Sequence, residues 1–166
     1  GAATKLGFLQ QPTSTAAGSS ISPAITVQVQ DANSNLVSSD TRNVTLAIGT
    51  NPGGGILSGT ATVAAVAGVA TFSNLSIDKA GTGYTLGATS SPALTGATSN
   101  PFNITIGGAV KLVFGQQPTN TAAGSSISPA ITVQIQDAGG NVVTSDNTTS
   151  VVLAIGTNPG GGTLSG

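Results

Sequence analysis

The sequence predicts an all-β protein of the two-sheet sandwich class. Apolar and polar residues alternate through almost every apolar segment, turn signals separate these segments at short intervals, and the same succession of strands and turns occurs twice. A period of two places apolar side chains on one face of a strand. About seven short strands in a stretch of roughly 105 residues are typical of a sandwich.

The repeat is the strongest of these signals. Residues 5–40 return at 111–146 with 28 of 36 positions identical, and 44–59 return at 151–166 with 14 of 16 identical. The offset changes from 106 to 107 between these two blocks. An insertion tolerated at that point indicates a surface loop.

The length of the repeat sets the domain organisation. A period near 106 residues is too long for a solenoid and matches one whole domain. We therefore expect a complete repeat over 1–109 and the first half of a second, near-identical repeat over 110–166. Few residues separate the last strand of one copy from the first strand of the next, which limits hinge freedom.

The strands follow from alternation, beginning with 24–31, where Ile25, Val27 and Val29 share one face. Later segments alternate in the same way, with these apolar residues on one face: Val44, Leu46, Ile48; Val63, Ala65; Ala70, Phe72; Leu75, Ile77; Tyr84, Leu86, Ala88; Phe102, Ile104, Ile106. We expect one two-sheet core that includes Ile25, Val27, Val29, Leu46, Phe72, Leu75, Tyr84, Leu86 and Ile104. Pro12 should divide the first strand into two edge pieces, and Pro23 should open the next strand.

Composition argues against catalysis. The chain has no Cys, His, Met or Trp, and its five acidic residues are all Asp, scattered along the sequence. General acid–base, nucleophilic and metal-assisted chemistry depend on residues of these kinds gathered in one place. The prediction is therefore a non-enzyme with no catalytic, cofactor-binding or metal-binding residues, and with no cofactor.

The charge pattern bears on partners. A net charge of −1 with 5% charged residues provides no basic cluster for phosphates or for an anionic membrane surface. The longest apolar stretch, near 63–70, is too short to span a bilayer. We expect no nucleic acid, no membrane insertion and no small-molecule substrate.

Several motifs have both a functional and a structural interpretation. The spacing Asp31-x-Asn33-x-Asn35 is similar to the start of a calcium loop, but Leu36 and Arg42 stand where that loop needs Gly and Glu, so a turn capped by the Asp31 side chain is favoured. The glycine runs 53–55 and 160–162 suggest a phosphate-binding loop, but we favour ordinary turns. The isolated strand lysines Lys5 and Lys111 suggest a covalent cross-link, but we favour exposed edge-strand lysines. Glycosylation sequons occur at Asn43, Asn74, Asn103 and Asn147. Sequons arise readily by chance in a chain so rich in Ser, Thr and Asn, and occupancy stays open.

Specific runs of residues resemble a known family. These are Lys-Leu-x-Phe-x-Gln-Gln-Pro, Pro-Ala-Ile-Thr-Val-Gln-Val-Gln-Asp-Ala, Gly68-Val-Ala-Thr-Phe72 and Gly81-Thr-Gly-Tyr-Thr-Leu86. Together they look like bacterial immunoglobulin-like tandem repeats of the invasin/intimin kind, and the resemblance covers the whole chain. It implies Greek-key sandwiches in a large adhesin or extracellular fibre at the cell surface. Tyr84 resembles the tyrosine corner of such domains, so its hydroxyl should bond to backbone.

The expected function is mechanical. Each copy would add about 35–45 Å to a stalk, fibre or filament. The alternative is an adhesion module that binds carbohydrate or a host or cell-surface protein, although loop sites of that kind usually carry aromatic or arginine anchors. A third interpretation, an accessory domain of a secreted hydrolase, depends on a catalytic domain elsewhere.

The second copy raises a question of partners. The chain has two sets of early strands, 5–59 and 111–166, but one set of late strands, 60–106. Leaving about ten core side chains unburied would cost roughly 10–15 kcal/mol, comparable to the stability of a domain. We expect other copies of the protein to supply late strands by complementation. The alternative is that the second copy is completed by a further segment of a longer repeat chain.

Overall fold

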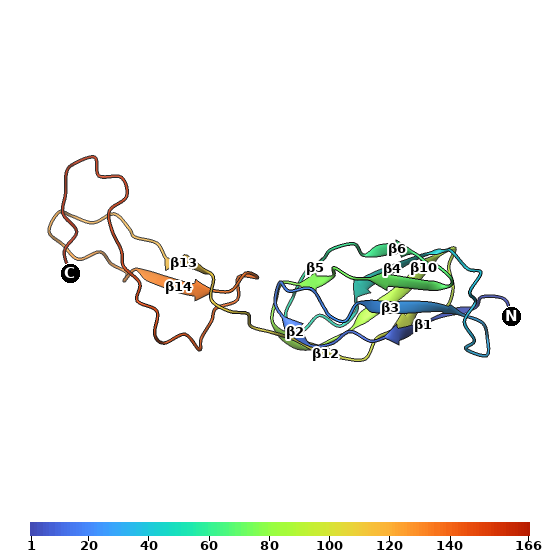
Figure 1. The fold of residues 1–166 in the computed structure, drawn as a ribbon. Coiled ribbons are helices and arrows are strands. Elements are labelled where there is room, and N and C mark those ends of the chain that lie inside the picture. Colours follow the sequence, from blue (N-terminus) through green and yellow to red (C-terminus); the bar gives the residue numbers. More distant parts are fainter.

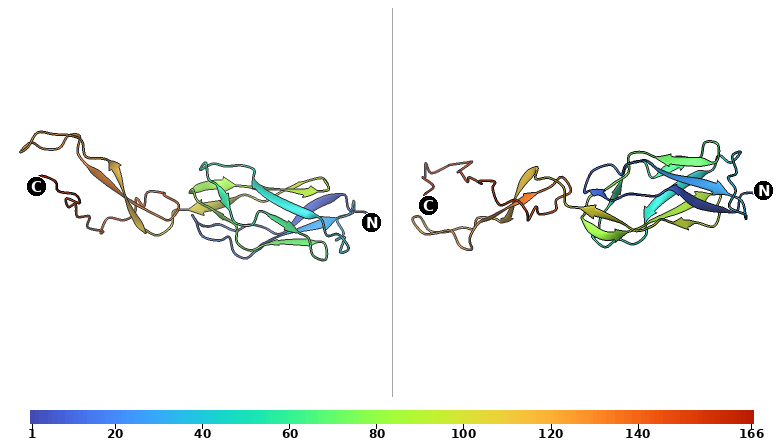
Figure 2. Two further views of the ribbon diagram at one scale, coloured as in Figure 1. Left: turned by 90° about the horizontal axis from the view of Figure 1, so that it is seen from above. Right: turned by 60° about the horizontal axis from the view of Figure 1, so that its bottom comes forward.

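The computed structural model describes residues 1–166 and consists of strands, turns and loops without a helix. Figure 1 shows two bodies in a row, joined by a single crossing of the chain, with the N- and C-termini at opposite ends. The two further views in Figure 2 show the same end-to-end arrangement. The all-β prediction is confirmed.

The first body contains four small sheets. Their strands, in order across each sheet, are β1 (Lys5–Gln10), β3 (Ile25–Gln30) and β7 (Val69–Phe72); β11 (Ala97–Thr98), β10 (Leu86–Ser91), β4 (Asn43–Ile48) and β6 (Thr62–Ala64); β2 (Thr15–Ala16), β12 (Phe102–Thr105) and β9 (Gly81–Tyr84); and β5 (Leu57–Ser58) with β8 (Ser76–Ile77). All pairings are antiparallel except β2 with β12. Four of these strands are only two residues long, so the expected seven strands are divided into more and shorter pieces.

One hydrophobic core fills this body, in a sandwich-like arrangement. Its 18 buried residues all lie between Leu6 and Ile104. All nine residues expected in the core are at most 2% exposed and belong to this one cluster, so their common burial is confirmed. In β3 the apolar face is fully buried while the intervening polar residues are half-buried, as the period of two requires.

Proline divides the strands as predicted. β1 ends at Gln10 and β2 begins at Thr15, on either side of Pro12, and the two pieces lie at the edges of different sheets. β3 begins at Ile25, two residues after Pro23. Because proline has no N–H to donate, both prolines stand outside the ladders.

One apolar residue departs from the expected pattern. Ile106 was expected to share the inward face of Phe102 and Ile104, but it is 45% exposed. β12 ends at Thr105, and Gly107 and Gly108 directly follow Ile106, so the alternation stops where the chain leaves the sheet.

The second body has one pair of strands, β13 (Lys111–Gln116) with β14 (Thr132–Gln136). The remaining residues to Gly166 form turns and extended loops. The structure has no helix long and apolar enough to cross a membrane.

Candidate interaction surface

The second copy repeats the local structure of the first wherever early strands pair with each other. The register of β13 with β14 equals that of β1 with β3 shifted by 106, as in Lys111 with Gln136 against Lys5 with Gln30. The irregularity between Phe8 and Gln10 also recurs, between Phe114 and Gln116. Near-identical sequence thus gives the same strand pair in both bodies.

The two copies differ in what covers their apolar faces. Leu6 is 4% exposed and its counterpart Leu112 is 53% exposed. The same contrast holds for Val44 at 0% against Val151 at 37%. Ile131, Val133 and Ile135, whose counterparts are fully buried, are only half-buried. We call this set the open face: Leu112, Phe114, Ile131, Val133, Ile135, Val151, Leu153 and Ile155.

The absence of a ladder at 150–155 has a structural cause. In the first copy, β4 is held between β10 and β6, and both partners come from the late half of the repeat. The second copy has early strands alone, so its segment equivalent to β4 has no neighbouring strand on either edge. It therefore forms no strand, and the edge of β14 that corresponds to the β7 side of β3 carries no partner strand.

An apolar pocket lies on the open face. Its volume is about 260 Å³, and all eight residues that line it are hydrophobic: Leu112, Val113, Phe114, Val133, Val151, Val152, Leu153 and Ala154. The counterpart of Leu153 in the first copy is Leu46, which pairs with Ala88 of β10. The pocket therefore borders the position that β10 occupies in the first copy.

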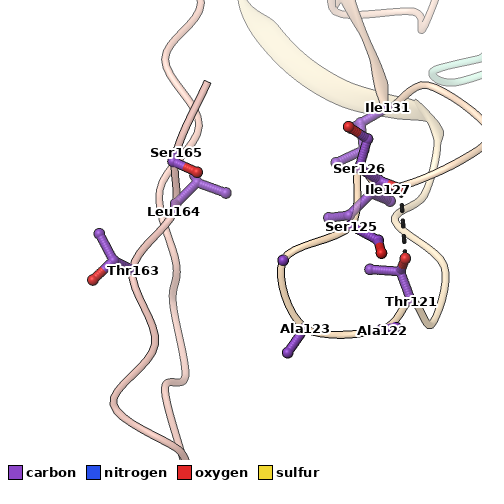
Figure 3. Close-up of a pocket in the computed structure, with 11 residues that line it drawn as sticks. Thr121, Ala122, Ala123, Ser125, Ser126, Ile127, Ile131, Thr163, Leu164 and Ser165 are labelled. Atoms are coloured by element: carbon purple, nitrogen blue, oxygen red, sulfur yellow. Dashed lines mark hydrogen bonds between the residues drawn. The ribbon is translucent and has the colours of Figure 1, made fainter.

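A second pocket, of about 490 Å³, lies between the loop 121–127 and the segment 163–165. Figure 3 shows these two segments facing each other, with Leu164 on one wall, Ile127 and Ile131 on the other, and the bond from Thr121 to Ser126. Eleven residues line it, and five are hydrophobic.

The first copy shows what fits between two such walls. There, the Gly18 and Ile21 amides donate to the carbonyl oxygens of Ile77 and Leu75 at 2.9 and 2.8 Å. From the other side, Leu57 pairs with Ile77. The counterparts of these wall residues line the pocket of the second copy: Gly124, Ile127 and Leu164. Its shape and its backbone groups thus match an extended segment such as Leu75–Ile77.

The calcium-like motif forms a turn. Asp31 Oδ1 accepts the backbone N–H groups of Asn33 and Asn35, each at 2.9 Å. The Asn35 backbone and side chain, helped by the terminal amine, hold the pKa of Asp31 down at about 2 despite some desolvation. Asp137 forms the same turn with Asn141. His, Cys, Asp and Glu side chains do not gather in any group of three or more.

Tyr84 is placed as its motif predicts. Its side chain is fully buried, and its hydroxyl donates to the Lys79 carbonyl oxygen at 2.9 Å. The ring of Phe102 lies 6.2 Å from its own ring, centre to centre. The bond to backbone is confirmed.

The other motifs have local roles. Lys5 Nζ donates to the Ala32 carbonyl at 3.4 Å on an edge strand. In the glycine run 53–55, the Gly55 amide donates to the side chain of Asn51. Among the sequons, Asn74 bonds to Thr60 and Asn103 accepts the Gly83 amide.

Sequence reasoning missed the contact between the two bodies. The turn 137–141 of the second copy bonds to the loop 78–80 of the first. A signal was present, because Asn33 and Ser34 of the first turn are replaced by Gly139 and Gly140 in the second.

No protein-family model matches this chain, and no curated protein sequence matches it significantly.

Proposed function

We propose that the chain is a non-catalytic structural repeat of an extracellular stalk, fibre or filament at a cell surface, made of immunoglobulin-like Greek-key sandwiches. The observation that carries the proposal is the pair of pockets on the second copy, which lie where the first copy holds its own late strands. The end-to-end arrangement in Figure 1 supports a spacing role, because each added copy lengthens the molecule.

The open face is an acceptor for the late strands of another copy, residues 60–106. In the first copy, Ile25 pairs with Phe72 and Val27 with Ala70. Their counterparts are Ile131, directly before β14, and Val133, on β14, whose corresponding edge has no partner strand. A donor β7 would add there by backbone hydrogen bonds, and alternate side chains would enter the core.

The count of strands decides when such complementation is favourable. When an intact chain donates its late strands to another chain, its own first repeat loses them. The apolar face of that first repeat is then uncovered, so the total number of open faces stays the same. Complementation lowers the free energy when the donor's late strands are not already paired. A heterologous contact of this kind need not close, so it can propagate a fibre.

The proposal is tested by adding a synthetic peptide of residues 60–109 to the intact chain. We expect a 1:1 complex by calorimetry, and amide protons of β14 and 151–155 that exchange more slowly. The Ile77→Asp peptide should not bind, because Ile77 is fully buried between two walls in the first copy. The Thr71→Asp peptide should bind, because Thr71 is exposed on β7.

Matched changes in the acceptor complete the experiment. Leu153→Asp places a charge on the open face and should abolish binding, whereas Ser145→Asp, at an exposed residue that lines neither pocket, should preserve it. If no peptide binds, or if Leu153→Asp binds as well as the unaltered chain, the acceptor role is wrong. Sedimentation of the chain alone tests exchange between intact copies: larger species that grow with concentration would show that exchange occurs, and a monomer at all concentrations would restrict complementation to late strands that are not already paired.

A further inference from the structure

The two bodies meet through a small polar interface, which we call the junction. It consists of four hydrogen bonds: Gly107 N–H to Asp137 Oδ2 at 2.8 Å, Ala80 N–H to Asn141 Oδ1 at 3.1 Å, Asn141 Nδ2 to the Asp78 carbonyl at 2.9 Å, and Lys79 Nζ to the Gly139 carbonyl at 2.8 Å. The loop 78–80 lies at the end of the first body and the turn 137–141 at the facing end of the second. Because the bonds reach backbone groups on both sides, they fix position and orientation together.

Asp137 is the centre of the junction. It is 1% exposed, and it is the one buried residue in 110–166. Burial raises the pKa of Asp137, but hydrogen bonds from Gly107, Asn141 and Gly139 outweigh burial and lower it. The carboxylate thus joins the linker to the turn.

The opposite end of the first copy carries the same turn. Asp31 N–H bonds to the Asn35 carbonyl at 2.9 Å, and Asp137 N–H bonds to the Asn141 carbonyl at 3.0 Å. The amine of Gly1 lies 3.3 Å from Asp31 Oδ2, in the position that the Gly107 amide holds at the junction.

The turns also share their backbone conformation. Ser34 has φ 68° and its counterpart Gly140 has φ 80°. Side chains at equivalent positions of the two turns therefore point in the same direction relative to the turn.

The turns differ at two positions, because Asn33 and Ser34 are Gly139 and Gly140 in the second copy. A Cβ at Gly140 would approach only the flexible end of the Lys79 side chain, at 3.3 Å. A Cβ at Gly139 would overlap the carbonyl oxygen of Asp78, a backbone atom that cannot move aside as a side chain can. Gly139 has no positive φ, and its counterpart holds Asn in the same turn. The glycine is therefore required by the close approach of the loop 78–80 and not by the turn itself.

We propose that Gly139 is the specificity determinant of the junction. A repeat with glycine at this position accepts the 78–80 loop of a preceding repeat against its turn. The first copy, with Asn33, rejects that loop in the same geometry. The identity of this one residue thus selects which repeats dock rigidly end to end.

The test compares Gly139→Asn with Asn33→Gly in the intact chain. Because the chain contains no cysteine, spin labels at Ser73→Cys and Ser145→Cys, both exposed, report the distance between the two bodies. We expect a narrow distribution for the unaltered chain and for Asn33→Gly, and a broad or displaced one for Gly139→Asn. Exchange of the Gly107 and Ala80 amide protons should be at least tenfold faster in Gly139→Asn.

A folding defect would not explain that result, because Asn is compatible with this turn in the first copy. The melting temperature of the first body, which contains neither residue 139 nor the open face, should be unchanged in Gly139→Asn. An unaltered distance distribution and unaltered amide exchange would overturn the proposal, and so would an equal effect of Asn33→Gly. Failure of peptide complementation would leave this outcome untouched, because none of the four bonds involves the open face.

Discussion

Leu46 and Leu153 occupy the same place in two copies of one sequence, yet Leu46 is 1% exposed and Leu153 is 40% exposed. Leu46 follows Val-Thr and Leu153 follows Val-Val, and both precede Ala-Ile-Gly-Thr. Their local sequence therefore does not decide their environment. The late strands decide it, since Leu46 pairs with Ala88 of β10.

This pair gives a direct test of what the core contributes. Leu46→Ala should lower the free energy of unfolding by about 2–5 kcal/mol, because it leaves a cavity among packed side chains. Leu153→Ala should change it by no more than about 0.5 kcal/mol. Urea titrations followed by circular dichroism measure both. Equal effects would show that the open face is covered in solution.

The glycine runs offer a second matched pair. A Cβ at Gly53 would overlap the Ala80 carbonyl and the Tyr84 hydroxyl, whereas nothing lies within 4 Å of one at Gly160. Gly53→Ala should therefore destabilise the first body by about 1–3 kcal/mol through overpacking. Gly160→Ala should be neutral. Thermal melting of the two variants compares them under identical conditions, and a neutral Gly53→Ala would contradict the packing around Tyr84.

Tyr84 itself can be tested by removing one atom. Tyr84→Phe keeps the ring and leaves the Lys79 carbonyl without the bond of 2.9 Å. Loss of a buried donor should cost about 1–2 kcal/mol. Phe102→Tyr is an informative comparison, because it adds a hydroxyl to the neighbouring ring without restoring that bond. If Tyr84→Phe has the same free energy of unfolding as the unaltered chain, the hydroxyl does not stabilise the fold.

Much of the fold could be predicted because the signals are local. Alternation marks Ile25, Val27 and Val29 as one face of a strand, and their burial follows from any sheet that covers that face. Proline acts equally locally, since it removes an N–H at Pro12 whatever the surroundings. The failure at Ile106 has the same origin: alternation continues past Thr105, but the glycines after it end the strand.

The interaction surfaces were harder to predict because they depend on residues far apart in the sequence. The strand count did indicate an open second copy. It did not reveal that Leu164 and Ile127 form the two walls of one pocket. The junction needs Asp78 and Gly139 to approach each other, and no periodicity connects two loops about 60 residues apart.

The last prediction concerns pH and metal ions. The pKa of Asp31 falls from 3.8 to about 2 through hydrogen bonds from Asn35, and the bond from Arg42 lowers the pKa of Asp40. A folded-state pKa below the unfolded one stabilises the fold above the unfolded value, and this stabilisation is lost as pH falls through the folded value. The melting temperature should therefore be flat from about pH 5 to 9, and should decline between about pH 4 and 2.

Asp31→Asn should make that acid decline shallower, because one titrating group is removed. EDTA should have no effect on the melting temperature, because the carboxylates do not gather into a metal-binding group. Scanning calorimetry across this range provides the measurement. A fall of more than a few degrees between pH 5 and 9, or on adding EDTA, would mean that a titrating group or a metal ion outside these turns stabilises the fold.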